Sequence, residues 1–342
     1  MTEKKYNVAV VGATGMVGRT MLSILEERNF PVDKVYALAS SRSVGTRIPF
    51  KDSELVVGDL ETFDFNLAEI GLFSPGASVS AIYAPKAVDA GCVVIDNTSK
   101  FRYEDDIPLV VSEVNPHAIG DYKNRGIIAN PNCSTIQMLV ALKPIYDAVG
   151  IERINVCTYQ AVSGTGQAAV DELNSQITSI VRANNPLVSS TVYPKQIACN
   201  VLPHIDAFQD NGYTKEEMKM VWETQKIFED DSILVNPTAV RVPVYNGHSE
   251  AVHIETKEKI DAGTARKLLE EMPGVTVLDS HEDGGYPTAI EAADKDPVFV
   301  GRIRGDISHP RGLNMWIVAD NLRKGAALNS IQIAEILVKS HI

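Results

Sequence analysis

The chain has 342 residues, of which 44% are hydrophobic, so it is long enough for two domains with proper cores. Its formal net charge of −12 argues against nucleic acid or an anionic membrane as a partner, and no apolar stretch approaches the length of a membrane span. The four cysteines lack the spacing of a disulfide framework or a zinc site. We therefore expect a cytoplasmic protein without a structural metal.

The beginning of the chain has the pattern of a dinucleotide-binding unit. Asn7–Val11 is almost entirely apolar, as in a central parallel strand, and the sequence GATGMVG and an amphipathic segment follow it. The apolar run is too short for a signal peptide. Gly12, Gly15 and Gly18 depart from the G-x-G-x-x-G spacing. A strand, a glycine turn and a helix in this order nevertheless predict a phosphate cradle at the helix N-terminus.

The second predicted strand, Val35–Ala39, ends in a serine-rich turn that contains Arg42. NAD-binding domains usually place an acidic residue here for the ribose hydroxyls. An arginine flanked by serines suits the 2′-phosphate of NADP better, and the alternative is a solvated loop arginine.

Further strands and helices alternate up to residue 129 and predict a doubly wound parallel sheet. Strand Cys92–Ile95 is followed by Asn97, Thr98 and Ser99, and then by Arg102. The carboxyl ends of such strands form the ligand crevice, so this polar cluster suits an anion. A surface ion pair of Arg102 is the alternative.

Cys133 lies where a short apolar strand, Ile127–Ala129, gives way to a helical pattern. We expect Ser134 and Thr135 to cap this helix. Unpaired backbone donors and the positive end of the helix dipole favour the thiolate, so Cys133 is the candidate nucleophile. A small buried hydrophobe is the alternative, and it is the interpretation that we give to the other cysteines: Cys92, Cys157 and Cys199.

The second half of the chain predicts a different, mixed sheet that begins with strand Arg153–Ala161. Gln160 lies at the end of that strand, and the loop 163–166 is rich in backbone donors. A helix is predicted from Gln167 to about Ala183. Residues 184–228 are predicted to form a helical subdomain of short helices joined by polar turns. Its clearest helix carries three charged residues on one face, which on spacing alone is an ordinary solvated ion-pair face: Glu216, Lys219 and Glu223.

Arg241–Tyr245 alternates, and the turn NGH leads into a second alternating segment, so the two are predicted to form a hairpin. His248 at this turn is the best general acid/base candidate, because imidazole titrates near neutral pH. Two more strands and a final helix complete the pattern.

Taken together, the chain resembles the aspartate-semialdehyde dehydrogenase family over nearly its whole length. The resemblance is carried by GATGMVG, ASSRS, DNTSKFR, NPNCSTIQ, TYQAVSGTG, EEMKMVWETQKI, RVPV with HSE, and ADNLRKGAA, in the order of the family. It implies a Rossmann-like NADP-binding domain at 1–131, completed by a helix at 322–342. It also implies an α+β catalytic and dimerisation domain at 132–321, with a helical subdomain at about 184–228.

The resemblance implies NADPH-dependent reductive dephosphorylation of L-aspartyl-4-phosphate to L-aspartate 4-semialdehyde, towards lysine, methionine and threonine. It also implies the residue roles. The catalytic residues would be Cys133 as nucleophile, cationic His248 as acid/base and Gln160 beside the acyl group. The substrate would be bound by Arg102, Asn132, Glu216, Lys219 and Arg241. The cofactor would be bound by Gly12, Thr14, Gly15, Met16, Val17, Ser40, Arg42, Ser43, Ser163, Gly164 and Asn321.

Two other functions compete with this interpretation. The first is a related acyl-phosphate reductase acting on N-acetylglutamyl phosphate, whose masked amino group would leave Glu216 without a purpose. The second is a non-catalytic NADP-binding protein, which would not need Cys133, Gln160 and His248 together. As partners we expect the small-molecule substrate, inorganic phosphate and a second copy in a homodimer, with a tetramer possible.

Overall fold

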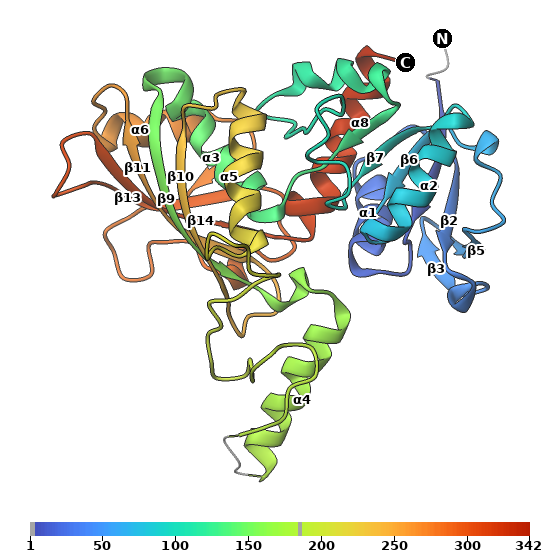
Figure 1. The fold of residues 1–342 in the computed structure, drawn as a ribbon, viewed down its shortest axis with the longest axis horizontal. Coiled ribbons are helices and arrows are strands. Elements are labelled where there is room, and N and C mark those ends of the chain that lie inside the picture. Colours follow the sequence, from blue (N-terminus) through green and yellow to red (C-terminus); the bar gives the residue numbers. More distant parts are fainter. Residues whose placement is uncertain (1–3, 184–186) are drawn as a thin grey trace. The chain divides into compact units, whose positions relative to one another are not determined.

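The structure is a computed structural model that describes residues 4–183 and 187–342. The chain forms two compact units, each described here by itself (Figure 1). Unit 1 comprises Met1–Pro131 and Ala326–Ile342, and unit 2 comprises Asn132–Gly325. In the described part of the chain, no helix is long and apolar enough to cross a membrane.

Unit 1 is built on a six-stranded sheet in the order β5-β2-β1-β6-β7-β8, in which every pair is parallel. The strands are β1 (Tyr6–Val11), β2 (Val32–Ala39), β5 (Gly58–Asp59), β6 (Ile70–Phe73), β7 (Val93–Asp96) and β8 (Ile127–Ala129). A small antiparallel pair, β3 (Arg47–Phe50) and β4 (Ser53–Val56), lies beside them. The helical elements are α1 (Met16–Glu27), η1 (Ser41–Ser43), η2 (Phe65–Leu67), α2 (Ala77–Asp89), η3 (Pro116–Asn124) and α8 (Leu328–Ser340).

The fold of unit 1 follows from its apolar strands and from one close contact. Strands β1 and β6 are almost entirely buried, as expected for strands covered on both faces. Helix α1 approaches β1 so closely that a Cβ on Gly18 would lie 2.2 Å from the carbonyl oxygen of Gly12. Only glycine fits there. The predicted doubly wound sheet is confirmed.

Unit 2 contains a second six-stranded sheet, in the order β10-β9-β11-β14-β13-β12. The strands are β9 (Ile151–Gln160), β10 (Leu234–Arg241), β11 (His248–Thr256), β12 (Val275–Val277), β13 (Val298–Gly305) and β14 (Gly312–Ala319). Pairs β10–β9 and β12–β13 are parallel and the other pairs are antiparallel, so the sheet is mixed as predicted. The helical elements are α3 (Cys133–Val149), η4 (Val162–Gly164), α4 (Gln167–Ala183), α5 (Lys215–Phe228), α6 (Ala262–Glu271), α7 (Ala289–Ala292) and the π-helical turn η5 (Arg323–Ala327).

The predicted hairpin after Arg241 is wrong. Strand β10 pairs with β9, apart from one bridge between Arg241 and Leu202, and β11 pairs with β9 and β14, so β9 lies between β10 and β11. The second alternating segment is strand β11, but β10 ends at Arg241, so the rest of the predicted strand Arg241–Tyr245 is not a strand. Strand β9, from elsewhere in the chain, pairs with both β10 and β11. Pairing to a distant strand is a tertiary choice that local alternation does not encode.

The expected short helical pieces before α5 are also absent from the described residues 187–214; residues 184–186 of that prediction lie outside the description. Side chains of α4 satisfy the backbone of this segment instead. Glu172 accepts from the N–H groups of Thr191, Val192 and Tyr193, and Gln176 accepts from those of Ile197 and Ala198. With its donors paired in this way, the segment runs along α4 without forming a helix (Figure 1).

Candidate active site

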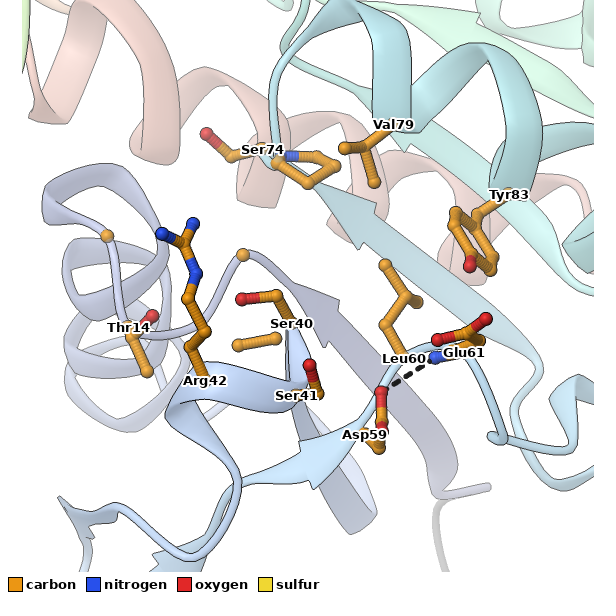
Figure 2. Close-up of a pocket in the computed structure, with 14 residues that line it drawn as sticks. Thr14, Ser40, Ser41, Arg42, Asp59, Leu60, Glu61, Ser74, Val79 and Tyr83 are labelled. Carbon is orange, nitrogen blue, oxygen red and sulfur yellow. Dashed lines mark hydrogen bonds between the residues drawn. The ribbon is translucent and has the colours of Figure 1, made fainter.

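A cleft of about 460 Å³ opens at the carboxyl ends of β1 and β2 in unit 1 (Figure 2). Of the residues predicted to bind a nucleotide, it is lined by Gly12, Thr14, Gly15, Ser40 and Arg42. Met16, Val17 and Ser43 were predicted with them and are not part of this lining. The cleft also has acidic residues that sequence reasoning missed, Asp59 and Glu61.

The backbone of this cleft fits a pyrophosphate. Gly12 has φ +85°, and a Cβ there would lie 2.7 Å from the carbonyl oxygen of Ser74. Helix α1 begins after Gly15 with no side-chain cap and no acidic residue in its first turn. Its first N–H groups and the positive end of its dipole therefore remain available to an anion.

Arg102 lies in unit 1, in the segment after β7. Its guanidinium donates to the carbonyl oxygen of Asn97 at 2.8 Å, and the side chain is 7% exposed. Its charge opposes the rise in pKa that burial causes at Asp96. The surface ion pair that was the alternative for Arg102 does not describe this buried side chain, and its predicted role in binding the substrate stays a prediction.

Cys133 is the first residue of α3 and is half-buried. The cap of this helix is Asn132, whose side-chain oxygen accepts from the N–H groups of Ser134 and Thr135 at 3.0 and 3.3 Å. The expectation that Ser134 and Thr135 are the caps is therefore wrong: they supply the donors and not the acceptor. The thiol still lies at the positive end of a 17-residue helix.

Three of the predicted residues stand in a row at the ends of neighbouring strands. In the parallel pair β10–β9, Arg241 is opposite Gln160, and in the antiparallel pair β11–β9, Ser249 is opposite Tyr159. The same register brings His248 beside Gln160. Strand β9, which lies between the two strands expected to form a hairpin, thus brings Gln160 between Arg241 and His248.

His248 is fully buried, and the backbone of one residue, Ala161, contacts both His248 and Arg241. Its Nδ1 accepts from the N–H of Ala161 at 3.1 Å, and the carbonyl oxygen of Ala161 accepts from Nη1 of Arg241 at 2.6 Å. Nδ1 therefore carries no proton, and the proton of the neutral ring is on Nε2. In the described part of the chain, that buried Nε2 has no hydrogen-bond partner.

The electrostatic environment keeps this imidazole neutral. Burial and then the positive charge of Arg241 lower the pKa of His248 from 6.5 to about 3, against the opposite effect of Glu216. The expected cationic form is thus wrong for the free protein at neutral pH. His248 offers an N–H donor to the site, and its charge does not favour the thiolate.

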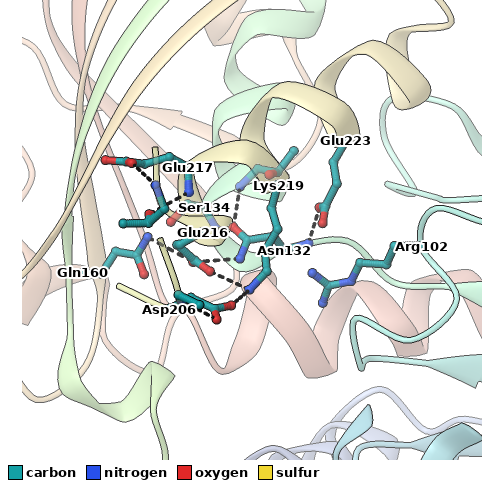
Figure 3. A network of polar contacts seen from close by, with 12 residues as sticks. Arg102, Asn132, Ser134, Gln160, Asp206, Glu216, Glu217, Lys219 and Glu223 are labelled. Carbon is teal, nitrogen blue, oxygen red and sulfur yellow. Dashed lines mark hydrogen bonds and ion pairs between the residues drawn. The ribbon is translucent and has the colours of Figure 1, made fainter. Parts of the chain in front are cut away.

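Helix α5 supplies an ion-pair network to the site (Figure 3). Glu216 receives hydrogen bonds from Lys219 at 2.8 Å, Asn132 at 2.9 Å and Gln160 at 3.3 Å, and Lys219 also donates to Asp206 at 2.9 Å. Burial would raise the pKa of Glu216, but the ammonium of Lys219, the hydrogen bonds from Lys219 and Asn132 and the charge of Arg241 lower it to about 2.

This helix face is not the solvated face that its spacing indicates. Glu216 and Lys219 are 5% and 9% exposed, and Glu223 is fully buried. Glu223 accepts from the backbone N–H of Asn132 at 2.6 Å. Two carboxylates of α5 thus hold Asn132, the residue before Cys133.

Asn321 connects the remaining parts of the site in unit 2. Its side chain donates to Ser163 at 2.9 Å and accepts from the N–H of Gly247 at 2.9 Å. A Cβ on Gly325 would lie 2.7 Å from that of Cys133 and 3.7 Å from that of Asn321. Contacts through Gly325 and Asn321 therefore link Cys133 to Gly247, the residue that precedes His248.

Gly164 completes the wall of the site in unit 2. A Cβ added there would lie 3.0 Å from Nη1 of Arg241 and 3.3 Å from Nε2 of His248. Ser163, Gly164 and Asn321 thus surround the histidine, while their predicted contact with the cofactor stays a prediction.

Sequence reasoning missed Asp206, the second carboxylate on Lys219, and Glu250. Asp206 lies in an irregular segment and gives no signal in the sequence. Glu250 gives one, because it is two residues after His248 and alternation places both on the same face of β11.

Comparison with known proteins agrees with this architecture. Residues 7–122 match the family model described as semialdehyde dehydrogenase, NAD binding domain, and residues 142–324 match that described as semialdehyde dehydrogenase, dimerisation domain. The aspartate-semialdehyde dehydrogenase of Legionella pneumophila is 65% identical over 99% of this chain and 97% of its own. That of Bacillus subtilis is 49% identical over 98% of both chains.

Solved structures give the same result. The crystal structure of aspartate semialdehyde dehydrogenase II from Vibrio cholerae, complexed with ASA, superposes with a TM-score of 0.97 at 57% identity. It covers 99% of this chain and 100% of its own. The Candida albicans aspartate semialdehyde dehydrogenase with NADP has a TM-score of 0.75 at 26% identity, covering 98% of both chains. The chain belongs to the aspartate-semialdehyde dehydrogenase family.

Proposed function

We propose that this chain catalyses NADPH-dependent reductive dephosphorylation of L-aspartyl-4-phosphate to L-aspartate 4-semialdehyde and phosphate, through a thioacyl intermediate on Cys133. One observation carries the proposal. The buried Nε2–H of His248, which lacks a partner within the described residues, stands in a row with Gln160 and Arg241, beside the helix that begins with Cys133. An unused donor in a buried site is a ready partner for a substrate oxygen.

Cys133 captures the acyl group. The helix N-terminus favours its thiolate, which attacks the carbonyl carbon of the acyl phosphate. The carbon–sulfur bond forms, the tetrahedral oxygen takes the negative charge, and that charge returns to expel phosphate. The Nε2–H of His248 and the backbone N–H groups at the start of α3 are the donors for this oxygen. After reduction of the thioester, the sulfur leaves as thiolate and the aldehyde is released.

Arg241 and Glu216 together suit an α-amino acid. The fork of Arg241 binds the α-carboxylate bidentately, which a lysine cannot do. Glu216 is ionised at neutral pH because its pKa is about 2. A carboxylate has about four lone-pair sites, and Asn132, Gln160 and Lys219 occupy three. The remaining site accepts from the α-ammonium, which an acetylated amino group could not provide.

The glycine turn and Arg42 in the cleft of unit 1 suit NADP. The uncapped start of α1 holds the pyrophosphate, and Arg42 neutralises the 2′-phosphate. When bound, the cofactor supplies the hydride that reduces the acyl group. The aspartate semialdehyde dehydrogenase of Candida albicans was solved with NADP, which supports this choice.

We also propose a homodimer in the cytoplasm, serving lysine, methionine and threonine biosynthesis. The matched family model of residues 142–324 is a dimerisation domain. On the sheet face of unit 2 away from α3, Tyr159 and Trp316 pack against each other; Tyr159 is 36% exposed and Trp316 is half-buried. Large aromatic side chains of this kind are enriched at interfaces. Sedimentation of the wild type and of a Trp316→Glu variant tests whether this sheet face forms the dimer interface. The variant should be monomeric. A variant that dimerises with unchanged affinity would contradict the use of this face as the interface.

The decisive experiment is oxidation of L-aspartate 4-semialdehyde with NADP, with and without phosphate. Phosphate-dependent reduction of NADP is expected, and Cys133→Ser should reduce it by at least about 1,000-fold, because a hydroxyl is a far weaker nucleophile there. Cys199→Ser, at an exposed cysteine, is the matched control and should remain active. Activity only with N-acetylglutamate semialdehyde, or full activity of Cys133→Ser, would contradict the proposal.

Cofactor choice needs a separate measurement. Arg42→Ala should raise KM for NADP by about 10–100-fold and leave that for NAD nearly unchanged, as expected for loss of one phosphate contact. Arg47→Ala removes an exposed arginine of β3, paired with Glu54, and serves as control. Equal effects of Arg42→Ala on both cofactors would remove the argument for NADP.

A further inference from the structure

Glu250 is a buried acid that the mechanism above does not use. It lies on β11 two residues after His248, on the sheet face covered by α3, and it is fully buried. Its strand partners, Thr158 of β9 and Ile317 of β14, are also fully buried. A carboxyl group in such a place needs a reason, because removing it from water is costly unless it is paired.

Its polar neighbours belong to the first turns of α3, Ser134 and Gln137. No aligned hydrogen bond is formed in the described part of the chain by four of the atoms in this group: both carboxyl oxygens of Glu250, Oγ of Ser134 and Oε1 of Gln137. The amide nitrogen of Gln137 uses one of its two N–H groups to donate to the carbonyl oxygen of His248 at 3.3 Å. Three neighbouring buried side chains thus carry four polar atoms without an aligned hydrogen bond in the described part of the chain.

A count of donors and acceptors favours a protonated Glu250. Oε1 of Gln137 is an acceptor and needs a donor, and an ionised carboxylate offers only acceptors. A protonated Glu250 donates its O–H to Gln137 and accepts from the hydroxyl of Ser134, which satisfies the whole group. The electrostatics agree, because burial raises the pKa of Glu250 well above 4.5, with a smaller opposite effect of Gln137 and Ser134.

We propose that Glu250 is a positioning residue, a neutral carboxylic acid that joins the first turn of α3, which carries Cys133, to β11, which carries His248. The link runs from Ser134, the neighbour of Cys133, through Glu250 to Gln137 and on to the backbone of His248. It fixes the separation of thiol and imidazole. Its effect on catalysis rests on the function proposed above, whereas the protonated acid itself does not.

The test compares Glu250→Gln, Glu250→Leu and the wild type, with Glu255→Gln as matched control on the same strand. Glu255 is half-buried and belongs to the other face of β11. Glu250→Gln keeps one donor and one acceptor and should retain kcat within about threefold. Glu250→Leu should lower kcat by about 10–100-fold with little change in KM, because misplacement of reacting groups affects the chemical step.

Two readouts are independent of turnover. The infrared carbonyl band of a protonated acid should be present in the wild type and in Glu255→Gln and absent from Glu250→Gln. The rate of alkylation of Cys133, followed by mass spectrometry of its peptide, should change its pH dependence in Glu250→Leu and not in Glu250→Gln.

The outcomes separate the two proposals. Absence of the acid band in the wild type, or wild-type kcat and thiol reactivity in Glu250→Leu, overturns the role of Glu250. If Glu250→Leu does not fold, the infrared comparison with Glu250→Gln still decides the protonation. A band and an altered thiol in a protein without semialdehyde activity would uphold Glu250 and contradict the proposed function.

Discussion

The buried imidazole of His248 should make the folded protein lose stability in mild acid. The folded state keeps the ring neutral until the pH approaches the pKa of about 3, whereas the unfolded chain takes up the proton near the ordinary 6.5. Below pH 6.5 the unfolded state therefore binds more protons than the folded state, and the free energy of unfolding falls as the pH falls. Above pH 6.5 this contribution is constant.

The size of the effect follows from the shift. One pH unit within this window corresponds to about 1.4 kcal/mol, so the contribution lost between about pH 8 and about pH 5 is about 2 kcal/mol. In His248→Asn the uncharged side chain cannot take up this proton. The free energy of unfolding of the variant should thus change by about 2 kcal/mol less than that of the wild type between the two pH values.

The measurement is urea unfolding of both proteins at the two pH values and at one protein concentration. His281→Asn, which removes an exposed histidine, is the control and should follow the wild type. The reasoning depends on the difference between the two pH values, so an overall loss of stability in His248→Asn does not disturb it. An identical pH dependence of His248→Asn and the wild type would refute a depressed pKa at this position.

The remaining predictions concern the backbone around the site. Gly164→Ala should lower kcat/KM by about 10–100-fold, because the new methyl group would lie 3.3 Å from Nε2 of His248 and take the space of the substrate. Gly325→Ala should slow alkylation of Cys133 by a similar factor, since its Cβ would lie 2.7 Å from that of the cysteine. Asn132→Ala should cost about 1–2 kcal/mol of stability in thermal unfolding, because α3 loses its cap.

Their controls use the same substitutions where the structure leaves room. Gly305→Ala meets no atom within 4 Å and should be neutral in both activity and alkylation. Asp261→Ala removes the cap of α6 and should cost a similar amount of stability without an effect on kcat. If Gly164→Ala kept wild-type kcat/KM, the space beside His248 would not be substrate space. If Asn132→Ala kept wild-type stability, the cap would be dispensable.

Local patterns determined the elements that carry the site. The apolar run and glycines after Asn7 predicted β1, the turn and α1, because strand burial and the start of a helix depend on adjacent residues. The change from an apolar strand to a helical period placed Cys133 at a helix start, and the structure has it there. Spacing alone, however, misjudged α5, whose charged face is buried.

Which strands pair with one another could be decided only by the tertiary structure. Residues 241–256 were predicted as a hairpin, but β10 ends at Arg241, and β9 lies between β10 and β11. This brings Gln160 between Arg241 and His248. The sequence by itself determined the element types, the residue types of the site and the family resemblance, since these follow from neighbours along the chain. The neutral state of His248, the charge of Glu216 and the buried acid at Glu250 depend on burial and on charges from distant segments. Those exist only once the chain has folded.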